Sequence, residues 1–288
     1  MLASVDAVRN LRALYVLLTT FAVAGLLSAL AQAALVRESV TAAALQAAGA
    51  LFVAFYGGNT AGILVMDDAR GVAVREIGEA LRAALSRAHR LLVALLAIAA
   101  AFAALGAALV ALLWLSREDV AGPRVGAWLF GALVPIGVLA VGLAALAGAA
   151  VVVPLAAPGV WAGTRPVALL RQLSRWTRDR LLKVALLMTA VSLLTAGVGA
   201  LASFVVVSGG RVVAQLATQV VGVDVPAAQL MAGLFGRGAG PAVAHPHAAA
   251  ALVGEGLVFA LALVLPGIVY LRGTCSVYLA MCEDSPDS

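Results

Sequence analysis

The residues of this sequence that could bind a metal are three histidines. His89 lies in a charged segment, whereas His245 and His247 form a His-Pro-His in a glycine-rich stretch. Two imidazoles are too few for a structural zinc site, which takes four ligands. No histidine falls within an apolar run, so a haem held by two imidazoles inside a membrane is excluded. The sequence therefore predicts no metal site and no cofactor.

Cysteines and carboxylates could act as nucleophiles or acid–base groups, but their spacing favours structural roles. Cys275 and Cys282 are seven residues apart on one predicted helix. That spacing puts them about 10 Å apart along its axis, too far for a disulfide, and we expect both to pack. Asp67 and Asp68 end an apolar run, where we expect a solvated helix cap rather than a catalytic pair. The sequence contains no glycine-rich phosphate loop with a lysine, no HExxH and no GxSxG, so we expect no enzymatic activity.

One acidic residue stands inside an apolar run. Glu255 lies between Gly254 and Gly256, about two turns into the last such run of the chain. An ionisable group inside a membrane is costly unless it is paired or hydrated, so it suggests function. The two glycines would let another helix or a small ligand approach closely. Alternatively the span begins later and Glu255 faces the outer interface; the sequence leaves both readings open.

The elements that would position these residues are long apolar helices. Hydrophobic residues make up 64% of the chain and charged residues 11%, against about 25% charged in soluble domains. A membrane span needs about 20 mostly apolar residues, and strand alternation typical of an outer-membrane barrel is absent. The sequence therefore predicts one all-α, polytopic membrane domain over residues 1–288. Its six expected transmembrane helices are residues 13–35, 43–66, 91–115, 126–158, 181–208 and 249–280.

The distribution of basic residues predicts the orientation of these spans. With both termini in the cytoplasm, fourteen of the nineteen basic residues fall on the cytoplasmic side, as the positive-inside rule requires. This topology accounts for the high pI without a nucleic-acid partner. Nearly all basic residues are arginine, which is typical of GC-rich codon usage. We expect a multi-pass protein of the bacterial inner membrane, whose first run, although it resembles a secretory signal, remains as a span.

Charged segments of helical periodicity separate several spans, and we call them elbows. In the first elbow, residues 74–90, apolar side chains fall on one face of a helix and charged ones on the other. Such a helix typically lies in the headgroup layer, and we expect it to turn there into the next span. Its predicted apolar face carries Val74, Ile77, Leu81, Ala84, Leu85 and Ala88. Its candidate membrane-surface residues are Arg75, Arg82, Arg87 and Arg90.

The second elbow begins at residue 165 and has the same construction. Pro166 suits the first turn of a helix, and a Leu-Ser-Arg at 173–175 repeats the one at 85–87. The predicted apolar face carries Leu169, Leu170, Leu173 and Trp176. The candidate membrane-surface residues of this elbow are Arg171, Arg175, Trp176 and Arg178.

The recurrence of elbows indicates an internal repeat. A unit of elbow, span and span fits three times, as residues 1–70, 71–163 and 164–288. The alternative is that arginine-flanked Ala/Leu helices look alike in any such protein. Residues 209–248 form the longest predicted connection, on the extracytoplasmic side, with one or two short helices at the outer surface.

The elbows resemble a known family. A surface helix with Leu173, Ser174, Arg175 and Trp176, followed by Leu-Leu and paired spans, is similar to the membrane domain of glycerophosphodiester phosphodiesterases. It is also similar to related six-helix bacterial membrane proteins of unknown function. The resemblance implies architecture only, because the catalytic domain of that family is a soluble barrel that this chain cannot encode.

Two functions from different classes follow from these patterns. The first is a non-enzymatic scaffold or accessory subunit of a membrane complex, which binds the lipid bilayer and a protein partner or a second copy of itself. The second is a transporter or lipid-handling protein with a cavity between the repeats near Glu255, Pro154 and Pro266. Coupled transporters usually carry several intramembrane charges. The scarcity of such charges here favours the scaffold.

Overall fold

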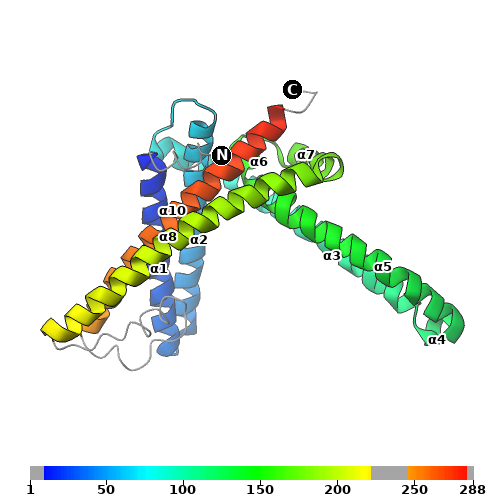
Figure 1. The fold of residues 1–288 in the computed structure, drawn as a ribbon, viewed down its shortest axis with the longest axis horizontal. Helices are drawn as coiled ribbons and strands as arrows, with labels where there is room; N and C mark the ends of the chain where they lie inside the picture. Colours follow the sequence, from blue (N-terminus) through cyan, green and yellow to red (C-terminus); the bar gives the residue numbers. More distant parts are fainter. Residues whose placement is uncertain (1–9, 222–245, 284–288) are drawn as a thin grey trace. The chain divides into compact units, whose positions relative to one another are not determined.

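The computed structural model describes residues 10–221 and 246–283, and these residues form helices and short connections (Figure 1). The helices contain the predicted apolar runs, as expected for segments that satisfy their own backbone hydrogen bonds, and α3 and α8 extend well beyond them. In chain order they are α1 (Leu11–Val36), α2 (Val40–Ala69), α3 (Ile77–Leu115), α4 (Glu118–Ala121), α5 (Pro123–Ala147), the π-helical η2 (Gly148–Val152), α6 (Val153–Trp161), α7 (Pro166–Asp179), α8 (Leu181–Val221) and α10 (Pro246–Glu283).

Six helical segments of the described residues are long and apolar enough to cross a membrane. Each predicted run overlaps one of them, so the all-α class and the six apolar helices are confirmed. The segments are Leu11–Gln32, Val40–Ala69, Ile77–Leu115, Pro123–Trp161, Leu181–Val213 and Ala262–Glu283.

Internal contacts divide the chain into two compact units. Unit 1 comprises Met1–Arg82 and Val191–Gly273, and unit 2 comprises Ala83–Ala190 and Thr274–Ser288. Helices α3, α8 and α10 therefore each contribute to both units. These boundaries differ from those of the three predicted repeat units, and the repeat stays a prediction.

In unit 1, α1 and α2 form an antiparallel hairpin with extensive contact between the two helices (Figure 1). The chain reverses at Glu38, whose φ of 58° is left-handed. The Ser39 N–H donates to the Ala34 carbonyl at 2.9 Å, and the Glu38 N–H donates to the Leu35 carbonyl at 2.9 Å. This is a Schellman motif with glutamate where glycine is usual.

The helices that precede the two elbows end in the same motif, with glycine in the left-handed position. Gly71 (φ 67°) follows α2, and Gly163 (φ 93°) follows α6. The N–H of Val72 donates at 3.2 Å, and that of Thr164 at 3.0 Å, to the carbonyl five residues earlier. The same motif ends α1 at Glu38, inside the first predicted repeat unit, so it does not distinguish the repeat boundaries.

In unit 2, α3 and α5 form a second hairpin, closed by α4 (Figure 1). A Cβ added at Gly137 would lie 3.6 Å from the Leu109 side chain, and one added at Gly148 would overlap the ring of Phe102. Glycine at position 148, the first residue of η2, therefore lets this turn approach α3 closely, whereas a Cβ at Gly137 would make an ordinary van der Waals contact.

The first elbow differs from its prediction, because α3 runs without a break from Ile77 to Leu115. At 1.5 Å per residue this helix is about 58 Å long, longer than the roughly 30 Å hydrocarbon core. The charged turns therefore extend the span and form no separate surface helix. Within the protein, Ala80, Ala84 and Ala88 of this segment are at most 1% exposed, whereas Leu81 and Leu85 of the predicted apolar face are 43% and 48% exposed.

The outer connection is also more helical than predicted. α8 continues to Val221, so residues 209–221 belong to a long helix and not to a separate short one. Its apolar residues there are exposed, namely Val212, Val213, Leu216 and Val220. Residues 222–245, with the second predicted short helix and His245, lie outside the described part.

Candidate functional site

The second elbow is a distinct helix, α7, held in unit 2 by its apolar face. Leu169, Leu173 and Trp176 recur at helical spacing and are at most 2% exposed. A Cβ added at Gly159 of α6 would overlap the Leu169 side chain. The rings of Trp176 and of Tyr278 in α10 make an edge contact, with their centroids 5.6 Å apart. The apolar face thus packs on protein, which corrects the expectation that it rests in the headgroup layer.

A chain of polar contacts beside the apolar face fixes this helix to the end of α10. The Tyr278 hydroxyl donates to Oε1 of Gln172 at 3.3 Å, and the Thr164 hydroxyl lies 3.0 Å from the Tyr278 hydroxyl. Nε2 of Gln172 in turn donates to Sγ of Cys282 at 3.3 Å. Cys275 is buried and Cys282 half-buried, and neither forms a disulfide. Gln172 was predicted on the polar face, so its role in docking was missed.

The outward face of α7 is basic. Arg171, Arg175 and Arg178 are exposed and follow one another at four and three residues, so they share one face of the helix. Two shallow hollows lie along it. The first is lined by Leu170, Arg171, Ser174, Arg175, Arg178 and Asp179, and the second, at the junction with α8, by Arg178, Asp179, Arg180, Leu181, Leu182 and Lys183.

A second polar cluster lies in unit 1, at the C-terminal end of α2. Nη2 of Arg75 is 2.9 Å from Oδ1 of Asp67, whose side chain is only 3% exposed. The prediction of a solvated cap is therefore wrong for Asp67. No local pattern indicates this burial, because Arg75 reaches Asp67 across the turn at Gly71. Oδ2 of Asp67 is also buried and has no hydrogen-bond partner among the described residues.

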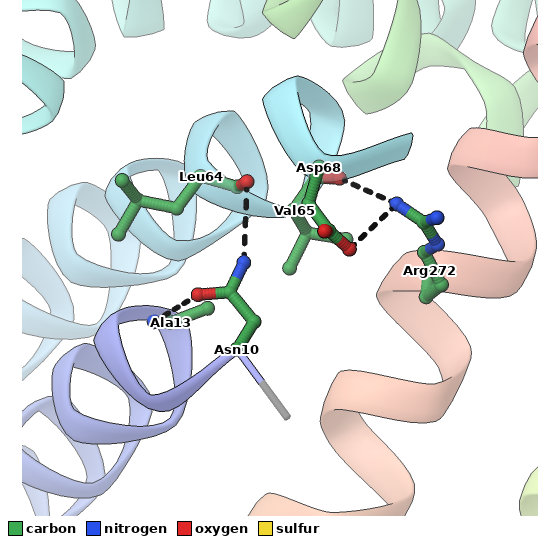
Figure 2. Close-up of polar contacts among 6 residues, drawn as sticks. All are labelled: Asn10, Ala13, Leu64, Val65, Asp68 and Arg272. Carbon is green, nitrogen blue, oxygen red and sulfur yellow. Dashed lines mark hydrogen bonds and ion pairs between the residues drawn. The ribbon is translucent and has the colours of Figure 1, made fainter. Parts of the chain in front are cut away.

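The neighbouring carboxylate, Asp68, is paired with α10. Nη1 of Arg272 lies 2.7 Å from Oδ2 of Asp68 and donates to the Val65 carbonyl at 3.5 Å (Figure 2). Arg75 and Arg272 both lie near the C-terminus of α2, where the helix dipole favours positive charge. The two ion pairs thus close the end of α2 and tie it to α10.

The start of α1 joins the same cluster. Oδ1 of Asn10 accepts the Ala13 N–H at 3.1 Å, as an N-cap does, and its Nδ2 donates to the Leu64 carbonyl at 3.5 Å (Figure 2). Nη1 of Arg12 donates to the carbonyls of Val74 and Arg75 at 2.8 and 3.0 Å. The cluster is a structural clamp at one end of unit 1. Over residues 10–221 and 246–283, no three His, Cys, Asp or Glu side chains gather to hold a metal.

The remaining predicted site residues lie on α3 and α10. Arg82 is exposed on α3, and Arg87 and Arg90 are half-buried there. Glu255 belongs to α10, but its side chain lies outside the described residues, so its intramembrane role stays a prediction.

No protein-family model, curated protein or solved structure matches this chain. Six helical segments of the described residues have the length and hydropathy of membrane spans, as in a multi-pass membrane protein.

Proposed function

We propose that the chain is a non-enzymatic scaffold or accessory subunit of a complex in the bacterial inner membrane, with both termini in the cytoplasm. The observation that carries this proposal is the outward face of α5 in unit 2. The resemblance to the membrane domain of glycerophosphodiester phosphodiesterases fits the same role, because it concerns architecture and not catalysis.

The glycines of α5 fall on two different faces of the helix. Gly137 lies against the Leu109 side chain of α3, whereas a Cβ added at Gly131 or Gly142 would meet no atom within 4 Å. At 100° per residue, Gly131, Pro135, Val138 and Gly142 form one stripe that points away from α3, and all four residues are exposed.

A stripe of this kind suits a protein partner better than lipid alone. Helices in membranes associate chiefly through small residues, which let backbones approach closely. A glycine offers no added contact to a lipid chain, whereas it allows the backbone of a partner helix to approach closely. We infer that a helix of another subunit, or of a second copy, packs on this stripe.

The test replaces both exposed glycines with leucine, as Gly131→Leu and Gly142→Leu together. The tagged protein is extracted in a gentle detergent, and the mass of the intact complex and its components are measured. The wild-type chain should carry a stoichiometric partner that the double variant loses. Ala132→Leu, an exposed small-to-large change off the stripe, should retain it; equal retention by both variants would overturn the proposal.

One observation supports the second candidate function, a transporter or lipid-handling protein: the π-helical turn in the fourth span. The Val153 N–H donates to the Gly148 carbonyl, five residues back, and Pro154 and Pro158 provide no N–H for the preceding turn. Such turns are common at functional sites, and interrupted helices at transport sites. On this alternative, Glu255→Gln should abolish transport without changing the thermal stability. The control variant Glu38→Gln, in the α1–α2 turn, should retain transport. An unaltered phenotype of Glu255→Gln would leave the scaffold ahead.

A further inference from the structure

We propose that the hollow at the junction of α7 and α8 binds the phosphate headgroup of an anionic phospholipid. The inference does not depend on the scaffold proposal, because it concerns a different surface of unit 2. It rests on three features of this hollow: basic side chains, exposed leucines next to them, and a helix that is fixed to the rest of unit 2.

The charge of the hollow is positive. It is lined by Arg178, Arg180 and Lys183 and by a single carboxylate, Asp179. Arg178 and Lys183 are exposed, so a ligand can reach them. Arginine and lysine near a membrane surface attract anionic lipids, and the guanidinium donors of arginine match phosphate oxygens.

The same hollow opens onto the apolar surface of a span. α8 begins at Leu181, and its apolar segment starts with the same residue. Leu182, which lines the hollow, is 72% exposed, and Leu186, one turn further, is 63% exposed. A phosphate held by Arg178 and Lys183 would therefore have its acyl chains along exposed leucines. Free phosphate or an acidic protein segment would use only the charged part.

The cations are held in place before a ligand arrives. Trp176 and Gln172, on the turns that precede Arg178, fix α7 to Tyr278, and Leu173 is 1% exposed. Because the apolar face of α7 packs against the rest of unit 2, the helix is fixed and its basic face points outward. Less backbone freedom is then lost on binding.

The test compares lipids that differ only in headgroup charge. Purified full-length protein is mixed with phosphatidylglycerol or phosphatidylcholine of the same acyl chains, and the lipids that stay bound are counted by native mass spectrometry. Wild type should prefer phosphatidylglycerol by about tenfold or more, given two exposed cations at the surface. The double variant Arg178→Gln, Lys183→Gln should lose this preference.

Controls separate a headgroup site from general charge and from misfolding. Arg124→Gln removes an exposed arginine of α5 in the same unit and should keep the preference. The double variant Arg178→Lys, Lys183→Arg keeps both charges and should also keep the preference for phosphatidylglycerol. This variant still tests the proposal if the glutamine variant does not fold. The proposal is overturned if the glutamine variant keeps the preference, if Arg124→Gln or the charge-conserving variant loses it, or if inorganic phosphate displaces the lipid.

Discussion

Arg75 and Asp67 form an ion pair at 2.9 Å in which the carboxylate is nearly inaccessible and the guanidinium is 30% exposed. The pair joins the last turn of α2 to the connection that leads into α3, and Arg12 holds the Arg75 carbonyl from α1. A buried charge is tolerated only while it is paired. The pair therefore makes the end of α2 sensitive to loss of one partner and less sensitive to loss of both.

We predict that Arg75→Leu lowers the free energy of unfolding by about 3 kcal/mol, because Asp67 is left charged and unpaired. The double variant Asp67→Leu, Arg75→Leu should recover most of this loss, since no buried charge then remains. Thermal unfolding in detergent measures both. Arg82→Leu, at an exposed site on α3, should change the stability by less than about 0.5 kcal/mol. A double variant less stable than Arg75→Leu would contradict the prediction.

Glu38→Gly should stabilise the α1–α2 hairpin by about 1 kcal/mol, because glutamate in the left-handed region is strained and glycine is not. Part of the gain is offset by the greater freedom of glycine in the unfolded chain. Glu38→Gln keeps the strain and should leave the melting temperature unchanged. A larger effect of the glutamine change than of the glycine change would show that the carboxylate, rather than the backbone, controls this turn.

Trp176→Ala should destabilise unit 2 by about 3–5 kcal/mol, the usual cost of removing a buried aromatic side chain. Since the Trp176 ring contacts Tyr278, its loss should also loosen α7, and trypsin should then cut at Arg171 and Arg175 faster than in the wild type. The comparison variant is Lys183→Ala, on the exposed start of α8. Unchanged trypsin cleavage of the tryptophan variant would mean that other contacts suffice to hold α7.

The sequence predicted those features that depend on local periodicity and composition. The six apolar helices followed from the length of the apolar runs, and the faces of α7 followed from the spacing of Leu169, Leu173 and Trp176. The break expected near Arg90 does not occur, because residues 88–92 contain no glycine, proline or capping residue that would end a helix. A change of polarity along a helix does not by itself end it.

Features that depend on contacts between distant residues could not be predicted. Gln172 and Tyr278 are 106 residues apart in sequence, and Asp68 and Arg272 come from the second and the last span. Nothing in the local pattern of either residue indicates its partner. The burial of Asp67 likewise depends on a turn geometry that brings Arg75 back onto α2.

Chemical labelling of the two cysteines tests the orientation of the chain. Cys282 is half-buried near the end of α10, whereas Cys275 is buried, so a membrane-impermeant maleimide should react only with Cys282. If the C-terminus is cytoplasmic, labelling requires inside-out vesicles and fails on intact spheroplasts. Ser39→Cys in a Cys282→Ser background places the thiol in the α1–α2 turn, one span away from the N-terminus, and should show the opposite pattern. Labelling of Cys282 on intact spheroplasts would reverse the predicted topology and would place the basic face of α7 outside the cytoplasm.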